Sequence, residues 1–200
     1  MTKMKKVLKP FQIEGEKFLS ERYHALLADE QGTGKTVMAL AAAEAVGAKS
    51  VVIVCPASVR PNWKQEAKEC GISFPIFDVV SYHGAGTKLP ADRKWDVFIG
   101  DEIHFCKTPE SNRTQAIFGN ENGLARRCTY KWVLTGTPVL NCPRALYPIL
   151  KTLHHDGIAP YTTWEKFTQR FCGAFFDGRG INTKGASHIE ELRKRLKGFM

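Results

Sequence analysis

The chain has 200 residues, a formal net charge of +9 and an isoelectric point near 9.3. That length suffices for one good-sized hydrophobic core, and 43% hydrophobic with 24% charged residues excludes a disordered or fibrous chain. No apolar run approaches the roughly 18 to 20 residues of a membrane span, and no apolar stretch follows the basic residues of the first fifteen positions, so we expect neither a membrane protein nor a secreted one.

The excess of positive charge is compatible with two classes of protein. A basic chain favours a polyanionic partner, nucleic acid first. A soluble enzyme with a basic surface explains the same charge equally well, and charge alone does not choose between them. The six cysteines form no C-x-x-C pair and have no histidines at zinc-ligand spacing, so we expect reduced thiols in a cytoplasmic protein and no metal cluster.

Short β-branched runs alternate with helical patterns along the first 155 residues. We expect strands at 24–28, 50–55, 75–82, 95–100 and 130–136. Helices are predicted at 35–46, ending at Gly47, at 59–70, ending at Gly71, and at 143–154, where Pro148 would bend the helix. Residues 111–127 are a helix or a loop. This alternation predicts an α/β domain with a mostly parallel sheet, which binds ligands at the carboxyl ends of its strands.

The character of the sequence changes after residue 155. A helix is predicted at 163–172, followed by an irregular stretch or a small hairpin. Ser187 and Glu190 have capping-box spacing, and the helix that they begin would still be running at the last residue. The basic run 193–197 lies on the polar side of that helix, so we read it as a solvated face rather than a nucleic-acid patch.

The segment "DEQGTGKT" (29–36) resembles a phosphate-binding loop, although Asp29 stands where the common pattern has its first glycine. Gly32 and Gly34 would let the backbone turn and, with Thr33, bring N–H groups onto phosphate oxygens. Lys35 would reach the β- and γ-phosphates, and the Thr36 hydroxyl would ligate Mg²⁺. These positions predict ATP and magnesium as ligands.

The second element that such a site needs is an acidic residue at the end of another strand. "WDVFIGDEIH" (95–104) supplies it. Asp101 would reach Mg²⁺ through water, and Glu102 would orient or deprotonate the attacking water. With Lys35 these two carboxylates form the predicted catalytic set. A solvated acidic pair is the alternative, but two adjacent carboxylates at a buried strand end are costly without a cation.

"DEQGTGKT", "DEIH" and "LTGTP" (134–138) occur in the order found in helicase superfamily two, and together they resemble the Swi/Snf-like DNA-dependent ATPases and translocases. In that family the loop commonly begins with Asp-Glu. Further segments are similar as well: 8–19 resembles the adenine-reading segment, 54–66 motif Ia, 81–84 motif Ib, and 134–153 motif III with its helix. Ile103 departs from the pattern, since alanine is commoner there.

The resemblance implies roles for further residues. Gln12 would read the adenine edge. His104, Thr135 and Thr137 would couple the nucleotide site to motif III, although a satisfied, partly buried histidine also explains His104. The candidates for contact with the DNA backbone are Ser58, Arg60, Asn62, Lys64, Ser81, Tyr82, Lys107 and Arg113. For the last two basic residues a solvated face is an equal alternative. Trp63, within the predicted helix, is expected to pack in the core.

The resemblance therefore predicts a RecA-like P-loop three-layer sandwich, a single lobe with a core at 1–155 and an extension at 156–200. We expect the second helicase lobe, with its arginine fingers, to be absent from this chain, which would be a monomer that hydrolyses ATP poorly alone. DNA, duplex or forked, would be contacted without sequence specificity. We expect a cytoplasmic location in a prokaryotic or viral host, or a nuclear one in a eukaryote. Two alternatives stay open: a truncated DNA- or partner-binding module with a vestigial or regulatory pocket, and a small-molecule kinase.

Overall fold

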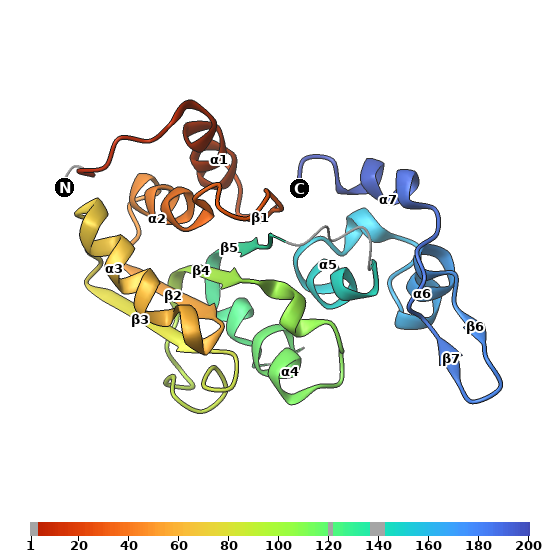
Figure 1. Cartoon of the computed structure of the whole chain (residues 1–200). Helices are drawn as coiled ribbons and strands as arrows, with labels where there is room; N and C mark the ends of the chain where they lie inside the picture. The colour runs from red at the N-terminus through yellow and green to blue at the C-terminus, as the bar shows by residue number, and fades with distance from the viewer. Residues whose placement is uncertain (1–3, 120–121, 137–142) are drawn as a thin grey trace.

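The central feature of the fold is a five-stranded sheet in the order β1-β5-β4-β2-β3, in which every pairing is parallel. The computed structural model describes residues 4–119, 122–136 and 143–200 (Figure 1). The strands are β1 His24–Leu27, β2 Ser50–Cys55, β3 Ile76–Ser81, β4 Trp95–Asp101 and β5 Cys128–Leu134. Because parallel strands share one carboxyl edge, the residues that follow all five strands gather on the same side of the molecule.

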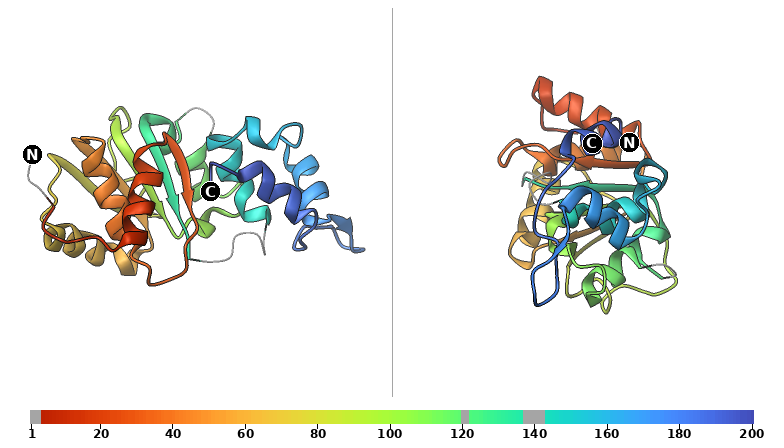
Figure 2. Two further views of the ribbon diagram at one scale, coloured as in Figure 1. Left: turned by 90° about the horizontal axis from the view of Figure 1, so that it is seen from above. Right: turned by 90° about the vertical axis from the view of Figure 1, so that its right-hand side faces the viewer.

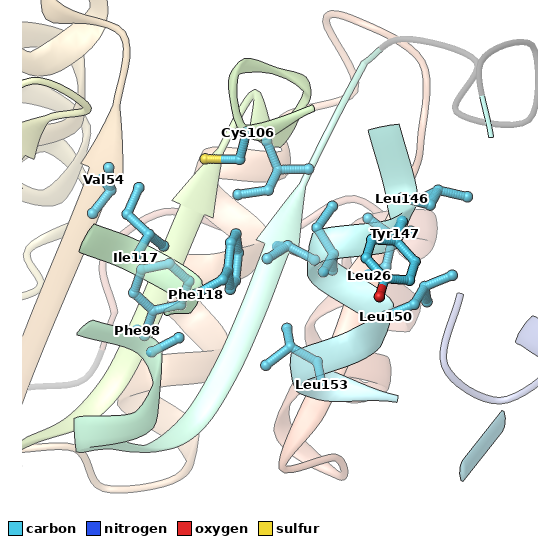
Figure 3. Close-up of a cluster of buried hydrophobic side chains, with 14 of the residues drawn as sticks. Leu26, Val54, Phe98, Cys106, Ile117, Phe118, Leu146, Tyr147, Leu150 and Leu153 are labelled. Atoms are coloured by element: carbon cyan, nitrogen blue, oxygen red, sulfur yellow. The ribbon is translucent and has the colours of Figure 1, made fainter. Parts of the chain in front are cut away.

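Helices cover both faces of this sheet. One layer consists of α1 Pro10–Ser20, α2 Lys35–Ala45 and α3 Arg60–Cys70, and the other includes α4 Asn112–Phe118 and α5 Tyr147–Leu153. Alternate strand residues serve the two layers: Val51 and Ile53 pack towards the first, and Val52 and Val54 towards the second. Figure 3 shows the second cluster, in which Phe98 of the sheet lies beside Ile117 and Phe118 of α4. The expected three-layer α/β architecture is confirmed.

Most of the expected elements appear within one or two residues of their predicted limits. Short 3-10 helices occur at Ala57–Val59, Ile103–Cys106, Leu124–Arg127, Pro143–Leu146 and Asp156–Ile158. The expected bend at Pro148 is wrong. The segment starts as a 3-10 turn, and Pro148 occupies the first turn of α5, where its missing N–H has no helical partner to lose.

The C-terminal segment contains α6 Trp164–Cys172, a hairpin of β6 Phe175–Phe176 and β7 Ile181–Asn182, and α7 Ile189–Leu196. Figures 1 and 2 place α6 and the hairpin at the end of the molecule opposite the N-terminus. Residues of α6 and α7 belong to the same hydrophobic cluster as α4 and α5. Among the described residues, no helix is both long enough and apolar enough to cross a bilayer.

Two expectations for the last helix are wrong. His188, not Ser187, occupies the N-cap position of α7, without a side-chain capping bond, and the Ser187 hydroxyl donates to the Arg170 carbonyl of α6. The helix also stops at Leu196, because the chain turns back at Gly198 (φ 88°) and the Phe199 carbonyl accepts a hydrogen bond from the Leu26 amide at 2.7 Å. Tertiary contacts with α6 and β1 thus override the local helical pattern.

Candidate nucleotide site

The loop between β1 and α2 has the backbone of a phosphate-binding loop. Gly32 and Gly34 have φ of 81° and 84°, a region that residues with a Cβ rarely adopt, and Gly34 is the N-cap of α2. A Cβ on Gly32 would meet no atom within 4 Å, so the loop is open on that side. The α2 N-terminus begins at once and directs its free N–H groups towards this opening.

Lys35 is held beside the loop by the loop's own backbone. Its Nζ donates to the carbonyls of Asp29 and Glu30 at 2.8 and 2.7 Å. Burial lowers the pKa of Lys35, and the nearby carboxylates of Glu102, Asp29 and Asp101 oppose that shift. The residues from two strand ends therefore share one electrostatic site. A phosphate would offer this ammonium stronger acceptors than neutral carbonyls do.

Gln12 of α1 reaches the same loop from another part of the chain. Its Nε2 donates to the Thr33 carbonyl at 3.0 Å, and its Oε1 accepts from the Lys9 amide at 3.0 Å. An amide side chain offers two donor hydrogens and two lone pairs, so one of each remains. The adenine-reading role of Gln12 stays a prediction, and its position over the loop supports it.

Asp101 is the last residue of β4, between β5 and β2. Its Oδ2 accepts from Trp63 Nε1 at 2.9 Å, and its backbone oxygen accepts from the Tyr82 hydroxyl at 2.5 Å. Burial raises the pKa of the Asp101 carboxyl, only partly offset by the Trp63 hydrogen bond. The Asp101 carboxylate is thus less well solvated than a surface carboxylate, which is typical of groups that bind a cation.

Glu102 follows in an unusual backbone conformation. Its φ and ψ are both 52°, the left-handed region, which costs a residue with a Cβ about 1–2 kcal/mol. Its Oε2 is buried and accepts no hydrogen bond, although His104 Nδ1 lies 3.2 Å away. A strained residue carrying a buried oxygen without a hydrogen bond is an arrangement that functional sites retain. Together with Asp101 and Lys35, these donors and acceptors fit a magnesium-bound polyphosphate.

The predicted coupling residues are placed unequally. His104 stacks on Phe105 with ring centroids 4.8 Å apart. Thr135 is buried, and its amide donates to the Leu27 carbonyl at the end of β1. The next glycine, Gly136, lies against the loop, since a Cβ there would come within 3.5 Å of Lys35 Nζ. Thr137 lies outside the described residues. The described part of the segment that resembles motif III therefore adjoins the loop at 29–36, and the coupling role stays a prediction.

The candidate DNA contacts all lie at or after the carboxyl ends of β2, β3 and β4. Five have exposed side chains: Ser58, Asn62, Lys64, Lys107 and Arg113. Arg60 and Ser81 are partly buried, and Ser81 Oγ accepts from the Gly84 amide. The prediction that Tyr82 contacts DNA is wrong. Its side chain is 6% exposed and its hydroxyl donates to the Asp101 backbone oxygen, so it is not available to a phosphate.

Sequence reasoning placed Trp63 in the core correctly, at 1% exposure, but missed its bond to Asp101. The only local signal was a tryptophan within a polar helix, which fixes no partner. Four cysteines are buried free thiols, namely Cys55, Cys70, Cys106 and Cys128, and Cys172 is buried as well. Cys142 lies outside the described residues.

A parallel α/β sheet with a glycine loop after its edge strand and an acidic pair after its central strand defines a P-loop nucleotide-binding domain. The SNF2-related domain family matches this chain over residues 11–91 and 85–200, and the chain belongs to that family.

Relatives and a solved structure are consistent with this membership. The chain is 30% identical over 209 residues to the SWI/SNF-related matrix-associated actin-dependent regulator of chromatin subfamily A-like protein 1 homolog of Caenorhabditis elegans, covering 92% of this chain and 29% of the relative. It is 27% identical to the DNA annealing helicase and endonuclease ZRANB3 of Bos taurus, covering 99% and 21%. The fold matches the Sulfolobus solfataricus SWI2/SNF2 ATPase core in complex with dsDNA at a TM-score of 0.78 and 21% identity, covering 99% of this chain and 44% of that one. The chain thus spans less than a third of the length of the Caenorhabditis elegans and Bos taurus relatives.

Proposed function

We propose that this chain is the ATP-binding first lobe of a DNA-dependent ATPase that couples hydrolysis to translocation on DNA. The observation that carries the proposal is the meeting of Lys35, Asp101 and Glu102 at the carboxyl edge of the sheet, beside the segments that resemble motifs Ia and Ib. Family membership supports the same reading. The contacts of α6 and α7 within the shared hydrophobic cluster support 156–200 as an extension of the core at 1–155.

Each residue of the site has a task in this proposal. The loop amides and Lys35 bind the phosphates, and Gln12 orients the base. Thr36 and Asp101 would hold magnesium, which neutralises phosphate charge when bound. Glu102 positions the attacking water and accepts its proton. A second lobe would supply arginine fingers, worth roughly 10³ to 10⁵ in rate, so this chain alone binds nucleotide but hydrolyses it slowly.

Nucleotide binding is tested by titrating the 200-residue chain with methylanthraniloyl-ATP and magnesium. Wild type should bind, and Lys35→Ala should weaken binding roughly 10- to 100-fold, because a charge-assisted contact of about 1.5–3 kcal/mol is lost. Equal affinities for the two proteins would contradict the proposed site. A fast DNA-stimulated ATPase rate from this chain alone would contradict the dependence on a second lobe.

DNA binding is tested with a labelled duplex and a labelled fork at several salt concentrations. Lys64→Gln, at the carboxyl edge of the sheet, should weaken binding to both and reduce the salt slope by about 1. Lys49→Gln is the matched control, because Lys49 is exposed but immediately precedes β2, at the opposite edge of the sheet. Identical behaviour of the two variants would remove the carboxyl edge as the DNA surface.

A further inference from the structure

Two buried side chains donate hydrogen bonds to Asp101, and both come from segments that carry candidate DNA contacts. Trp63 lies on the buried side of α3, between the exposed Asn62 and Lys64. Tyr82 directly follows β3. Both donors are almost completely buried, at 1% and 6% exposure, so water does not compete for these bonds.

A buried indole N–H needs an acceptor, and a carboxylate is not required for that purpose. Trp132 Nε1 donates to the backbone oxygen of Arg22 at 2.9 Å. Trp95 Nε1 does donate to a carboxylate, Asp78 Oδ2, also at 2.9 Å, but at the amino end of β4. Trp63 differs from both because its acceptor is the carboxylate that stands at the candidate magnesium position.

Resting on the proposed function, we propose that Trp63 is a positioning residue for Asp101. The indole N–H engages Oδ2 and fixes the carboxylate rotamer, and the backbone amide of Glu102 also interacts with this carboxylate. The Tyr82 hydroxyl fixes the backbone oxygen of the same residue, so the end of β4 is held through main chain and side chain. Partners of this kind, one step removed from a metal, orient its ligands and are worth 10–100-fold in metal affinity.

One consequence follows from the position of Trp63 on α3. The helix presents Lys64 to solvent and Trp63 to Asp101, so α3 joins the candidate DNA face to the candidate magnesium position. The Trp63 side chain and its one hydrogen bond to Asp101 span the distance between the two.

The test measures how much magnesium strengthens nucleotide binding. Methylanthraniloyl-ATP, excited directly, is titrated into the 200-residue chain with magnesium and then with EDTA, and the ratio of the two dissociation constants is the magnesium enhancement. Trp63→Phe keeps a large buried ring and removes the N–H. It should lower the enhancement about 10- to 100-fold while the affinity in EDTA stays at the wild-type value. Trp95→Phe, which also loses an indole–carboxylate bond, should leave the enhancement unchanged.

The outcomes separate this inference from the function on which it rests. A wild-type chain that shows no magnesium-dependent binding overturns the proposed function, and the role of Trp63 with it. Wild-type binding with an unchanged enhancement in Trp63→Phe overturns the positioning role alone. An equal loss with and without magnesium also overturns it, because a loosened loop gives that result. If Trp63→Phe fails to fold, benzothienylalanine at position 63 replaces the N–H by sulfur in a ring of the same shape, and the same ratio decides.

Discussion

Replacing Glu102 by glycine should give a more stable protein than replacing it by alanine. Both changes remove the same carboxylate and its buried oxygen, so their difference isolates the backbone. At φ 52° and ψ 52°, alanine keeps the left-handed strain of about 1–2 kcal/mol, and glycine does not. The greater conformational freedom of glycine stabilises the unfolded chain by about 0.4–1 kcal/mol, which offsets part of this difference. The free energy of unfolding of Glu102→Gly should therefore be about 1 kcal/mol higher than that of Glu102→Ala.

The assay is urea unfolding of both variants, with thermal unfolding as a second measurement. For a domain of this size the difference corresponds to about 2–4 °C in Tm. His188 offers a matched control, because it is the other described non-glycine residue with positive φ, at 50°, and lies outside the nucleotide site. The His188→Gly variant should be more stable towards unfolding than His188→Ala by a similar amount. An alanine variant at 102 as stable as the glycine variant would refute the strain at Glu102, and a glycine advantage at 188 would then show that the assay can detect such strain.

Three further predictions concern the loop, the buried carboxyl and the thiols. Gly34→Ala should weaken nucleotide binding at least tenfold in the same titration, because the residue has φ 84° and the new Cβ would lie 2.5 Å from Gln12 Nε2; an unchanged affinity would contradict the loop geometry. Burial raises the pKa of Asp101, so the folded chain binds more protons between the unfolded and folded pKa values, and stability falls as pH rises through that window. Asp101→Asn should lack this fall and be more stable than wild type above the window, as measured by urea unfolding from pH 4 to 7; parallel pH profiles would argue against it. Burial raises the pKa values of the thiols of Cys55, Cys106 and Cys128 to about 12. At pH 8 a disulfide reagent should therefore label these cysteines only after denaturation, and rapid labelling in the folded protein would be inconsistent with their burial.

Sequence alone determined the elements of this protein whose signals are local. The β-branched run 50–55 became a strand buried on both faces, and the glycines at 32 and 34 took the positive φ that the loop pattern requires. Order along the chain was sufficient to bring the loop and the acidic pair to one edge, because all parallel strands of a sheet end on the same side. The family was predicted from these same motifs, and the comparison confirmed it.

Only the tertiary structure decided how the polar groups are paired. Gln12 and Thr33 lie 21 positions apart, and Trp63 and Asp101 lie 38 apart, so no local pattern could join them. Tyr82 looked like a surface contact by motif position, yet it is buried against the end of β4. A buried donor must find an acceptor, but which acceptor lies within reach depends on how helices and strands pack against each other. Because of that packing, the buried Trp63 is a partner of Asp101, the proposed magnesium ligand.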